Sequence, residues 1–228
     1  MPSAIASIGA LFCMLLMAAA AAAAPVNITS STLIDTVLPV VTTHCNGPDE
    51  RALAAILPVA TDHGSHASGV VFAENRVLTA AHALQDASHY FVRVSGGFRE
   101  AELLVLDRES DLAVLAVDTQ GIAPLPLSAL EPADQQTVWA VGYPRAQAMA
   151  TSTGVFQRNR EGALHTSASI DSGQSGGGLL ACSNGSYQLL GMLRGYGAYL
   201  SGDHYVKLEN HSVSVAATTI HQFLGSWQ

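Results

Sequence analysis

From Ser68 onward the chain is a succession of short runs rich in Val, Leu, Phe and Tyr, broken by Gly, Asn, Asp and Pro. Such runs favour the pleated, half-buried surface of a β-strand, and interruptions this frequent leave little length for helices. The sequence therefore predicts an all-β fold. The expected strands form two groups, at 68–73, 76–81, 90–95, 101–107 and 112–118, and then at 137–143, 152–159, 163–169, 176–181, 187–195 and 204–210.

Three segments depart from the strand pattern. Residues 118–136 contain three prolines among polar residues, which disrupt both helical and strand periodicity, so we expect a connection between two domains. In residues 215–228 the apolar side chains recur near helical spacing, which predicts a terminal amphipathic helix. Residues 51–58 are expected to form one short helical turn that ends at Pro58.

The first 24 residues carry no charged side chain and are almost wholly apolar, and they end in a run of alanines before Pro25. This composition predicts a signal peptide over residues 1–24, because Ala-x-Ala sites suit signal cleavage. The start lacks Lys and Arg, which leaves an uncleaved membrane anchor as the alternative. We expect a secreted or periplasmic protein, with no stable membrane association after signal cleavage.

Removal of the signal peptide leaves two cysteines, Cys45 and Cys182, in a compartment where a disulfide persists. A bridge requires the two Cα atoms to lie within about 7 Å, which the sequence does not reveal. Both a Cys45–Cys182 disulfide and two separate buried thiols therefore stay open.

The charge balance argues against a nucleic-acid partner. The chain has 10 basic and 18 acidic residues, a formal net charge of -8, and no basic cluster to hold phosphates. Its 49% hydrophobic content is that of a globular protein with a core rather than of a disordered chain.

The residues that could perform chemistry begin with Ser175, which stands between glycines in IDSGQSGGGLL. A hydroxyl is a weak nucleophile until a histidine takes its proton, and the histidine needs an orienting carboxylate. His82 follows a strand-like run in VLTAAHAL, and Asp111 precedes one in DRESDLAVLAV. Their order, His, Asp, Ser, is one of three known for a catalytic triad. Asp107 competes with Asp111 as the orienting carboxylate.

The segments TAAH, DLAVL and GQSGG resemble the three signatures of trypsin-like (chymotrypsin-fold) serine proteases. Their short spacing is most similar to the compact bacterial branch that includes HtrA-type protease domains, and WAVGYP resembles the strand that opens the second barrel there. The resemblance covers residues 68–224 and favours Asp111 over Asp107, because Leu-Ala-Val-Leu follows Asp111 directly. It implies two antiparallel Greek-key β-barrels with a C-terminal helix, divided as 1–24 signal peptide, 25–66 N-terminal segment, 67–118 first barrel, 119–136 linker and 137–228 second barrel with the helix.

The resemblance also implies a role for each site residue. His82 accepts the proton of Ser175, Asp111 steadies the imidazolium, and the amides of Gly173 and Ser175 form the oxyanion hole. The implied activity is that of an endopeptidase that hydrolyses proteins or peptides through an acyl-enzyme, without a metal or an organic cofactor.

A metal site is not expected elsewhere. The pair His63 and His66 in HGSH has no third ligand of obvious spacing, which predicts a solvated loop.

The residue before the serine departs from the digestive relatives, which carry an acidic side chain there that pairs with a newly cut N-terminus. This chain has Gln174, and a neutral amide forms no ion pair. We therefore expect the site to form without zymogen cleavage.

The sequence indicates less about substrate preference than about the catalytic residues. By offset from the serine, the base of the main substrate pocket falls near Ser169, with Ile170 beside it, so no carboxylate selects Arg or Lys. Tyr196 would narrow the pocket towards small or medium apolar side chains, whereas Arg194 would favour an acidic one. The family's Glu-specific members use a histidine where this chain has Leu193. The alternative for Tyr196 and Arg194 is an ordinary exposed strand edge.

Two other functions stay open. GQSGG fits the Gly-x-Ser-x-Gly elbow of serine esterases with the α/β-hydrolase fold, with Asp203 and either His211 or His221 as partners. That elbow requires a helix after the serine, and too few residues follow Ser175 for strand-helix units. The other is a catalytically inactive binding protein of the trypsin fold. Since the terminal helix ends the chain, we expect no appended peptide-binding domain and a monomer.

Overall fold

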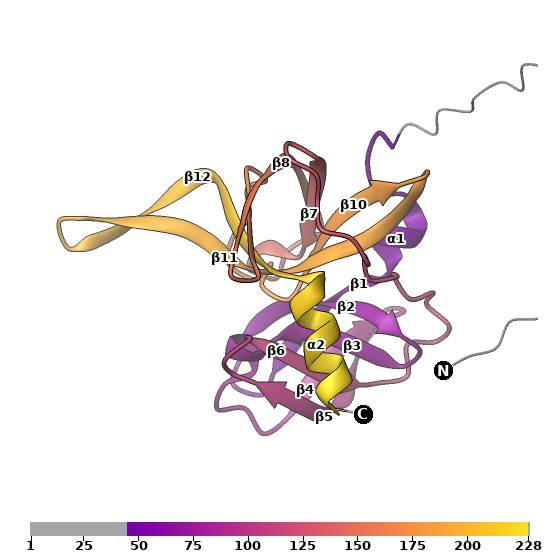
Figure 1. The fold of residues 1–228 in the computed structure, drawn as a ribbon. Coiled ribbons are helices and arrows are strands. Elements are labelled where there is room, and N and C mark those ends of the chain that lie inside the picture. The colour runs from indigo at the N-terminus through magenta and orange to yellow at the C-terminus, as the bar shows by residue number, and fades with distance from the viewer. Residues whose placement is uncertain (1–44, 228) are drawn as a thin grey trace, which may run out of the picture. The chain divides into compact units, whose positions relative to one another are not determined.

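The computed structural model describes residues 45–227, and the predicted signal peptide at 1–24 lies outside the described residues. Two closed antiparallel barrels of six strands each make up the fold, as predicted (Figure 1). The first has the order β1-β2-β3-β6-β5-β4. Its strands are β1 (Ile56–Thr61), β2 (His66–Ala73), β3 (Arg76–Ala80), β4 (Tyr90–Val94), β5 (Gly97–Asp107) and β6 (Leu112–Ala116).

The second barrel repeats this order as β7-β8-β9-β12-β11-β10. Its strands are β7 (Thr137–Gly142), β8 (Ala150–Arg160), β9 (Ala163–Thr166), β10 (Gly178–Ser183), β11 (Ser186–Ser201) and β12 (His204–Ala216). Between β6 and β7 the described chain has no helix and no named strand. An isolated β-bridge in this connection pairs Leu127 with Leu189.

The first strand is where the sequence prediction was wrong. The helix α1 (Glu50–Ala54) is shorter than the predicted turn, and the barrel begins at Ile56, before the predicted boundary at residue 67. Pro58 lies inside β1, opposite Ser68 of β2. The Ser68 N–H donates to the carbonyl of Ser175, and the Ser68 carbonyl accepts the Thr79 hydroxyl. Neither backbone group of Ser68 therefore needs a hydrogen-bond partner in β1. This explains why a proline is tolerated here.

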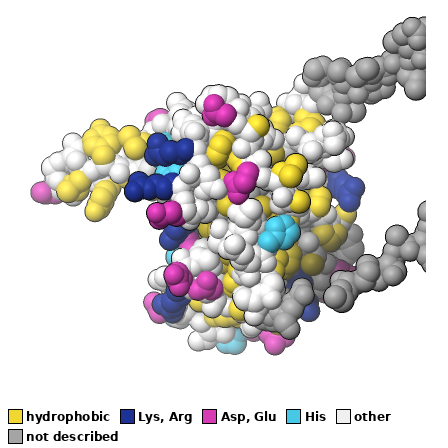
Figure 2. Space-filling model, viewed as in Figure 1, with side chains coloured by type: hydrophobic (Ala, Val, Ile, Leu, Met, Phe, Trp, Pro, Cys, Tyr) yellow, Lys and Arg dark blue, Asp and Glu magenta, His cyan; other side chains and the backbone are white. Residues whose placement is uncertain are grey.

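The strands β11 and β12 continue past the barrel as a two-stranded hairpin (Figure 1). Large apolar side chains stay exposed on it, among them Tyr199, Leu200 and Tyr205. Figure 2 shows hydrophobic side chains gathered along this projection. The hairpin begins at the part of β11 that lines the candidate site, described below.

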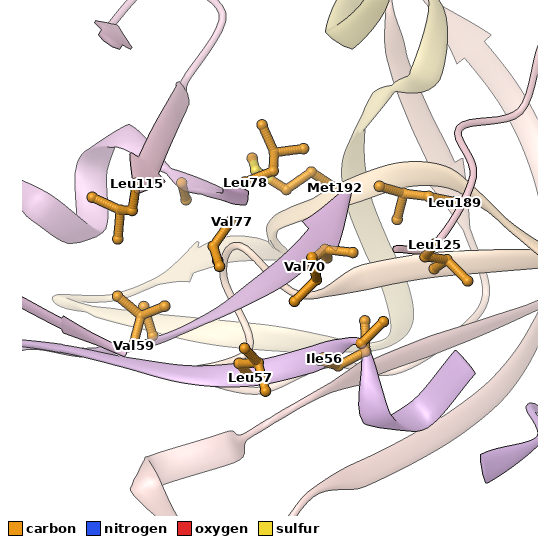
Figure 3. Close-up of a cluster of buried hydrophobic side chains, with 14 of the residues drawn as sticks. Ile56, Leu57, Val59, Val70, Val77, Leu78, Leu115, Leu125, Leu189 and Met192 are labelled. Carbon is orange, nitrogen blue, oxygen red and sulfur yellow. The ribbon is translucent and has the colours of Figure 1, made fainter. Parts of the chain in front are cut away.

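The main buried cluster joins side chains of both barrels (Figure 3). Ile56 and Leu78 of the first barrel share it with Leu189 and Met192 of β11 and with Leu125 of the connection. Burying one such side chain contributes about 1.5–3 kcal/mol, so this shared core fixes one barrel against the other.

The chain ends in the described region with α2 (Ala217–Trp227), the predicted helix. Ile220 and Phe223 of α2 are buried in the main cluster.

A disulfide joins Cys45 to Cys182 of β10, with the Cα atoms 6.1 Å apart. No helix among the described residues is long and apolar enough to cross a membrane.

Candidate active site

Strand pairing in the first barrel brings His82 and Asp111 together. In the β3–β6 ladder Ala80 lies opposite Leu112, and the next backbone bond runs from Ala81 N to Asp111 O over 3.1 Å. His82 lies in the 3-10 turn that follows β3. One ladder therefore sets two residues far apart in sequence side by side.

The two side chains are joined by hydrogen bonds. His82 Nδ1 lies 2.8 Å from Asp111 Oδ2 and 3.0 Å from Oδ1, and the His82 backbone N–H donates to Oδ1 over 2.9 Å. An ionised carboxylate only accepts, so Nδ1 carries a proton, and in the neutral imidazole the lone pair is then on Nε2. His82 has the orientation that a general base requires.

Asp111 is only 4% exposed, yet it favours the ionised form. Burial acts to raise the pKa of Asp111, but hydrogen bonds from His82 and the charge of Arg194 outweigh it, and the pKa lies below its ordinary value. Arg194 Nε is 3.2 Å from Asp111 Oδ2. This guanidinium contact had no counterpart in the sequence prediction.

The competing carboxylate, Asp107, serves the turn instead. It accepts from the backbone N–H of Glu109 at 3.0 Å and from the hydroxyl of Ser110 at 2.6 Å. These bonds, the Ser110 side chain first, hold the pKa of Asp107 below its ordinary value. The geometry brings Asp111, rather than Asp107, to His82.

Ser175 lies in the loop before β10. Its hydroxyl donates to the carbonyl of Arg194 over 3.1 Å, and no hydrogen bond joins it to His82 within the described residues. A serine side chain turns between staggered rotamers, and catalytic hydrogen bonds are often unformed without substrate. Ser175 and His82 nevertheless line the same cleft, of about 390 Å³.

Hydrogen bonds accepted by two carbonyls fix the orientation of the peptide planes around Ser175. In a trans peptide the N–H points opposite to the C=O. Arg145 N donates to Ser172 O over 2.8 Å, and Gly177 N donates to Gln174 O over 2.9 Å. The N–H groups of Gly173 and Ser175 therefore point the other way, and neither donates to an acceptor within residues 45–227. Both residues line the cleft.

The loop is braced by its own side chains. Gln174 is 4% exposed, and its Oε1 accepts the Asp171 N–H over 2.8 Å. Asp171 in turn forms an ion pair of 2.6 Å with Arg145 Nη2. The hydrogen bond from the Ser172 N–H and the charge of Arg145 lower the pKa of Asp171, whereas burial raises it. The net result is a pKa below the ordinary value. Gln174 thus braces the loop from within through its contact with the Asp171 backbone.

Ser68 ties this loop to the first barrel, and sequence reasoning missed it. Its hydroxyl donates to Gly173 O over 2.9 Å and accepts the Tyr143 N–H over 2.9 Å, while its own N–H donates to Ser175 O. A Cβ on Gly176 would collide with Ser68 O, and φ at Gly176 is +85°, so glycine is required there. No local signal could reveal Ser68, since its partners lie about a hundred residues away.

The predicted specificity residues separate into two groups. Ile170, Arg194 and Tyr196 line the cleft of Ser175, whereas Ser169 and Leu193 do not. The Ser169 hydroxyl bonds to Asn210. Leu193 is fully buried, and its backbone bonds to Gly176 and Gly177 in the nucleophile loop.

The two histidines of the predicted solvated loop also have different environments. His63 is exposed, but His66 lines the cleft of Ser175, which the sequence did not indicate. Within residues 45–227 no group of three or more His, Cys, Asp or Glu side chains could hold a metal ion.

The esterase partners do not meet the serine. Asp203 lies in the turn between β11 and β12, and His211 contacts His165 at 3.3 Å. His221 is on α2, and Ser175 is followed by the strand β10 rather than by a helix. This arrangement is unlike an α/β-hydrolase elbow.

Comparisons with known proteins agree with this architecture. Residues 67–192 match the family model of the trypsin-like peptidase domain. Serine endoprotease DegS of Haemophilus influenzae is 30% identical over 138 residues, which cover 55% of this chain and 40% of DegS. This chain therefore matches less than half the length of that relative.

Solved structures show the same fold. A serine endoprotease from Yersinia pestis superposes with a TM-score of 0.66 at 26% identity, over 78% of this chain and 64% of that one. The HtrA-type protease AlgW, solved with a tripeptide, gives a TM-score of 0.65 at 23% identity, over 77% of this chain and 60% of that one.

Proposed function

Because this chain belongs to the family of trypsin-like peptidase domains, we propose that it is a serine endopeptidase that hydrolyses peptide bonds in proteins or peptides. One observation carries the proposal. His82 is oriented by the buried Asp111 and shares a single cleft with Ser175.

In the proposed mechanism a peptide carbonyl enters the cleft and Ser175 Oγ turns from the Arg194 carbonyl towards His82 Nε2. His82 takes the hydroxyl proton as Oγ attacks, and Asp111 stabilises the imidazolium that forms. His82 then gives the proton to the leaving amine, and water hydrolyses the acyl-enzyme by the same steps in reverse.

The amides of Gly173 and Ser175 are proposed to bind the oxyanion. Their support is the orientation of the two peptide planes, held by Arg145 and Gly177. Donors that are already aimed at a developing charge need no reorganisation during the reaction. Since Gln174 and Arg145 brace the loop internally, the site is proposed to form without cleavage of a zymogen.

The bond from Ser175 Oγ to the Arg194 carbonyl favours a second candidate function, a catalytically inactive binding protein of the same fold. Export to the periplasm or the outside, and a monomeric state, are also proposals. The disulfide Cys45–Cys182 supports an oxidising compartment.

The test is treatment of the purified protein with a fluorophosphonate, followed by mass spectrometry. We expect one adduct on Ser175, absent in Ser175→Ala and strongly slowed in His82→Ala, together with hydrolysis of a peptide library. A folded wild-type protein that forms no adduct would favour the binding protein.

A further inference from the structure

A second cleft, of about 340 Å³, borders the candidate active site. Its lining consists of Ala81, His82, Gln85, Arg108, Asp111 and Arg194. His82 and Arg194 also line the cleft of Ser175, so the two clefts are neighbours that share these side chains. A peptide held at Ser175 would pass the entrance of the second cleft.

The second cleft is positively charged in an otherwise acidic protein. Two guanidinium groups line it against one carboxylate, while the whole chain carries a formal net charge of -8. That carboxylate, Asp111, is buried and already engaged by His82 and Arg194. Arg108 is exposed and forms no ion pair with the described residues. Glu109 lines a different cleft, which also includes Arg194.

The geometry of an extended peptide sends one side chain into each cleft. Successive side chains of an extended strand point to opposite faces, and their Cα atoms are about 3.8 Å apart. If the residue that Ser175 attacks places its side chain beside Ile170 and Tyr196, the preceding side chain points away from them. The second cleft adjoins the cleft of Ser175 through the shared side chains His82 and Arg194, so it can receive that preceding side chain.

We propose that this cleft is a subsite for a carboxylate side chain, Glu or Asp, on the residue immediately before the cleaved one. The inference rests on the proposed function, and it names the substrate class of the same site. Arg108 would supply the binding charge, because a guanidinium offers paired donors to a carboxylate. Arg194 adds charge but is partly engaged by Asp111.

The preference should be moderate, since Arg108 is solvated. A hydrogen bond between a guanidinium and a carboxylate is weakened when water and salt screen it. We therefore expect the kcat/KM for a Glu peptide to exceed that of the matched Gln peptide by about five- to thirtyfold. The ratio should fall as salt is raised.

The experiment uses peptides that differ only in Glu, Gln or Lys at the preceding position. Arg108→Ala should bring the Glu/Gln ratio close to one, and Arg108→Glu should favour Lys; the rate of fluorophosphonate labelling of Ser175 is measured in both, so that each ratio is compared at a known reactivity of the serine. The matched control is Arg99→Ala, another exposed arginine, on β5 and outside both clefts. It should leave the ratio unchanged. Equal rates for all three peptides in the wild type overturn the subsite.

Failure of the proposed function would look different. If the wild type neither labels nor cleaves, fluorescent forms of the same peptides are titrated against Ser175→Ala, and binding is followed by anisotropy. Tighter binding of the Glu peptide that depends on Arg108 keeps the subsite and rejects the protease. Equal binding, or none, rejects the subsite as well.

Discussion

The two barrels have the same strand order, yet each presents its part of the candidate site differently. The first barrel holds His82 and Asp111 in a contact that its own β3–β6 ladder creates. The second barrel holds Ser175 in a loop whose fixed points include Ser68 of the first barrel and Arg145 of its own. The pair of His82 and Asp111 is therefore assembled within one barrel, and the Ser175 loop depends on the fit between both.

This difference explains the state of the site. His82 and Asp111 are already hydrogen-bonded to each other, and the backbone bond from Ala81 to Asp111 extends the β3–β6 ladder that sets them side by side. The Ser175 hydroxyl instead donates to the backbone carbonyl of Arg194. A disturbance of the barrel contact should thus affect the serine loop and leave the histidine pair intact.

The largest effects should come from replacing the three residues of the proposed triad. Ser175→Ala and His82→Ala are each expected to lower kcat by about 10⁶-fold, and Asp111→Asn by about 10⁴-fold, because the three side chains act as a unit. Initial rates on a peptide substrate measure this, and circular dichroism checks the fold. Residual activity within tenfold of wild type in either alanine variant would remove that residue from the mechanism.

A large effect on stability is expected from the disulfide. Cys45 and Cys182 are separated by 137 positions, and a bridge across so long a loop restricts the unfolded chain strongly. Replacing both by Ala should lower the free energy of unfolding by about 2–5 kcal/mol. Urea titration measures it, and a reductant should destabilise the wild type but not the double variant. An unchanged midpoint would mean that the bridge does not form in the protein.

Ser68→Ala tests the contact between the barrels. Removing the hydroxyl leaves Gly173 O and Tyr143 N without that partner, which should lower kcat about ten- to hundredfold with little change in KM. This is less than the 10²–10³-fold loss for deleting an oxyanion donor itself. The unfolding free energy should fall by about 1–3 kcal/mol.

Ser167→Ala is the matched control, because its hydroxyl accepts the Val155 N–H inside the second barrel alone. It should cost stability without lowering kcat. If both variants lose stability equally and neither loses kcat, Ser68 is structural and does not position the loop.

These contacts also mark what the sequence could predict. Most strands were accessible, since each depends on a local run. The motifs and their order named His82, Asp111 and Ser175, whose catalytic roles stay predictions. The strand β1 was missed because Pro58 normally interrupts a strand. It is tolerated here because Ser68, the residue opposite it in β2, forms its backbone hydrogen bonds outside β1. Ser68, Arg145 and Arg108 act through partners or clefts that form only when the chain has folded, so no local pattern marks them.

The smallest effects should distinguish two carboxylates, one beside each half of the site. The pKa values of Asp111 and Asp171 are both lowered in the folded state. Such a group stabilises the fold above its unfolded pKa of about 3.9, and this contribution is lost as the pH falls through the lower folded value. Stability should therefore decline on acidification below about pH 5.

The two aspartates should contribute unequally to this decline. The Asp111 side chain is 6% exposed and held by His82, whereas that of Asp171 is 29% exposed and pairs with an Arg145 that is 68% exposed. Water and salt screen the second pair more strongly. Unfolding free energies at several pH values should show that Asp111→Asn flattens the acid decline more than Asp171→Asn does. High salt should diminish only the Asp171 contribution. The reverse ranking would mean that the serine loop, rather than the histidine pair, carries the stronger electrostatic tie.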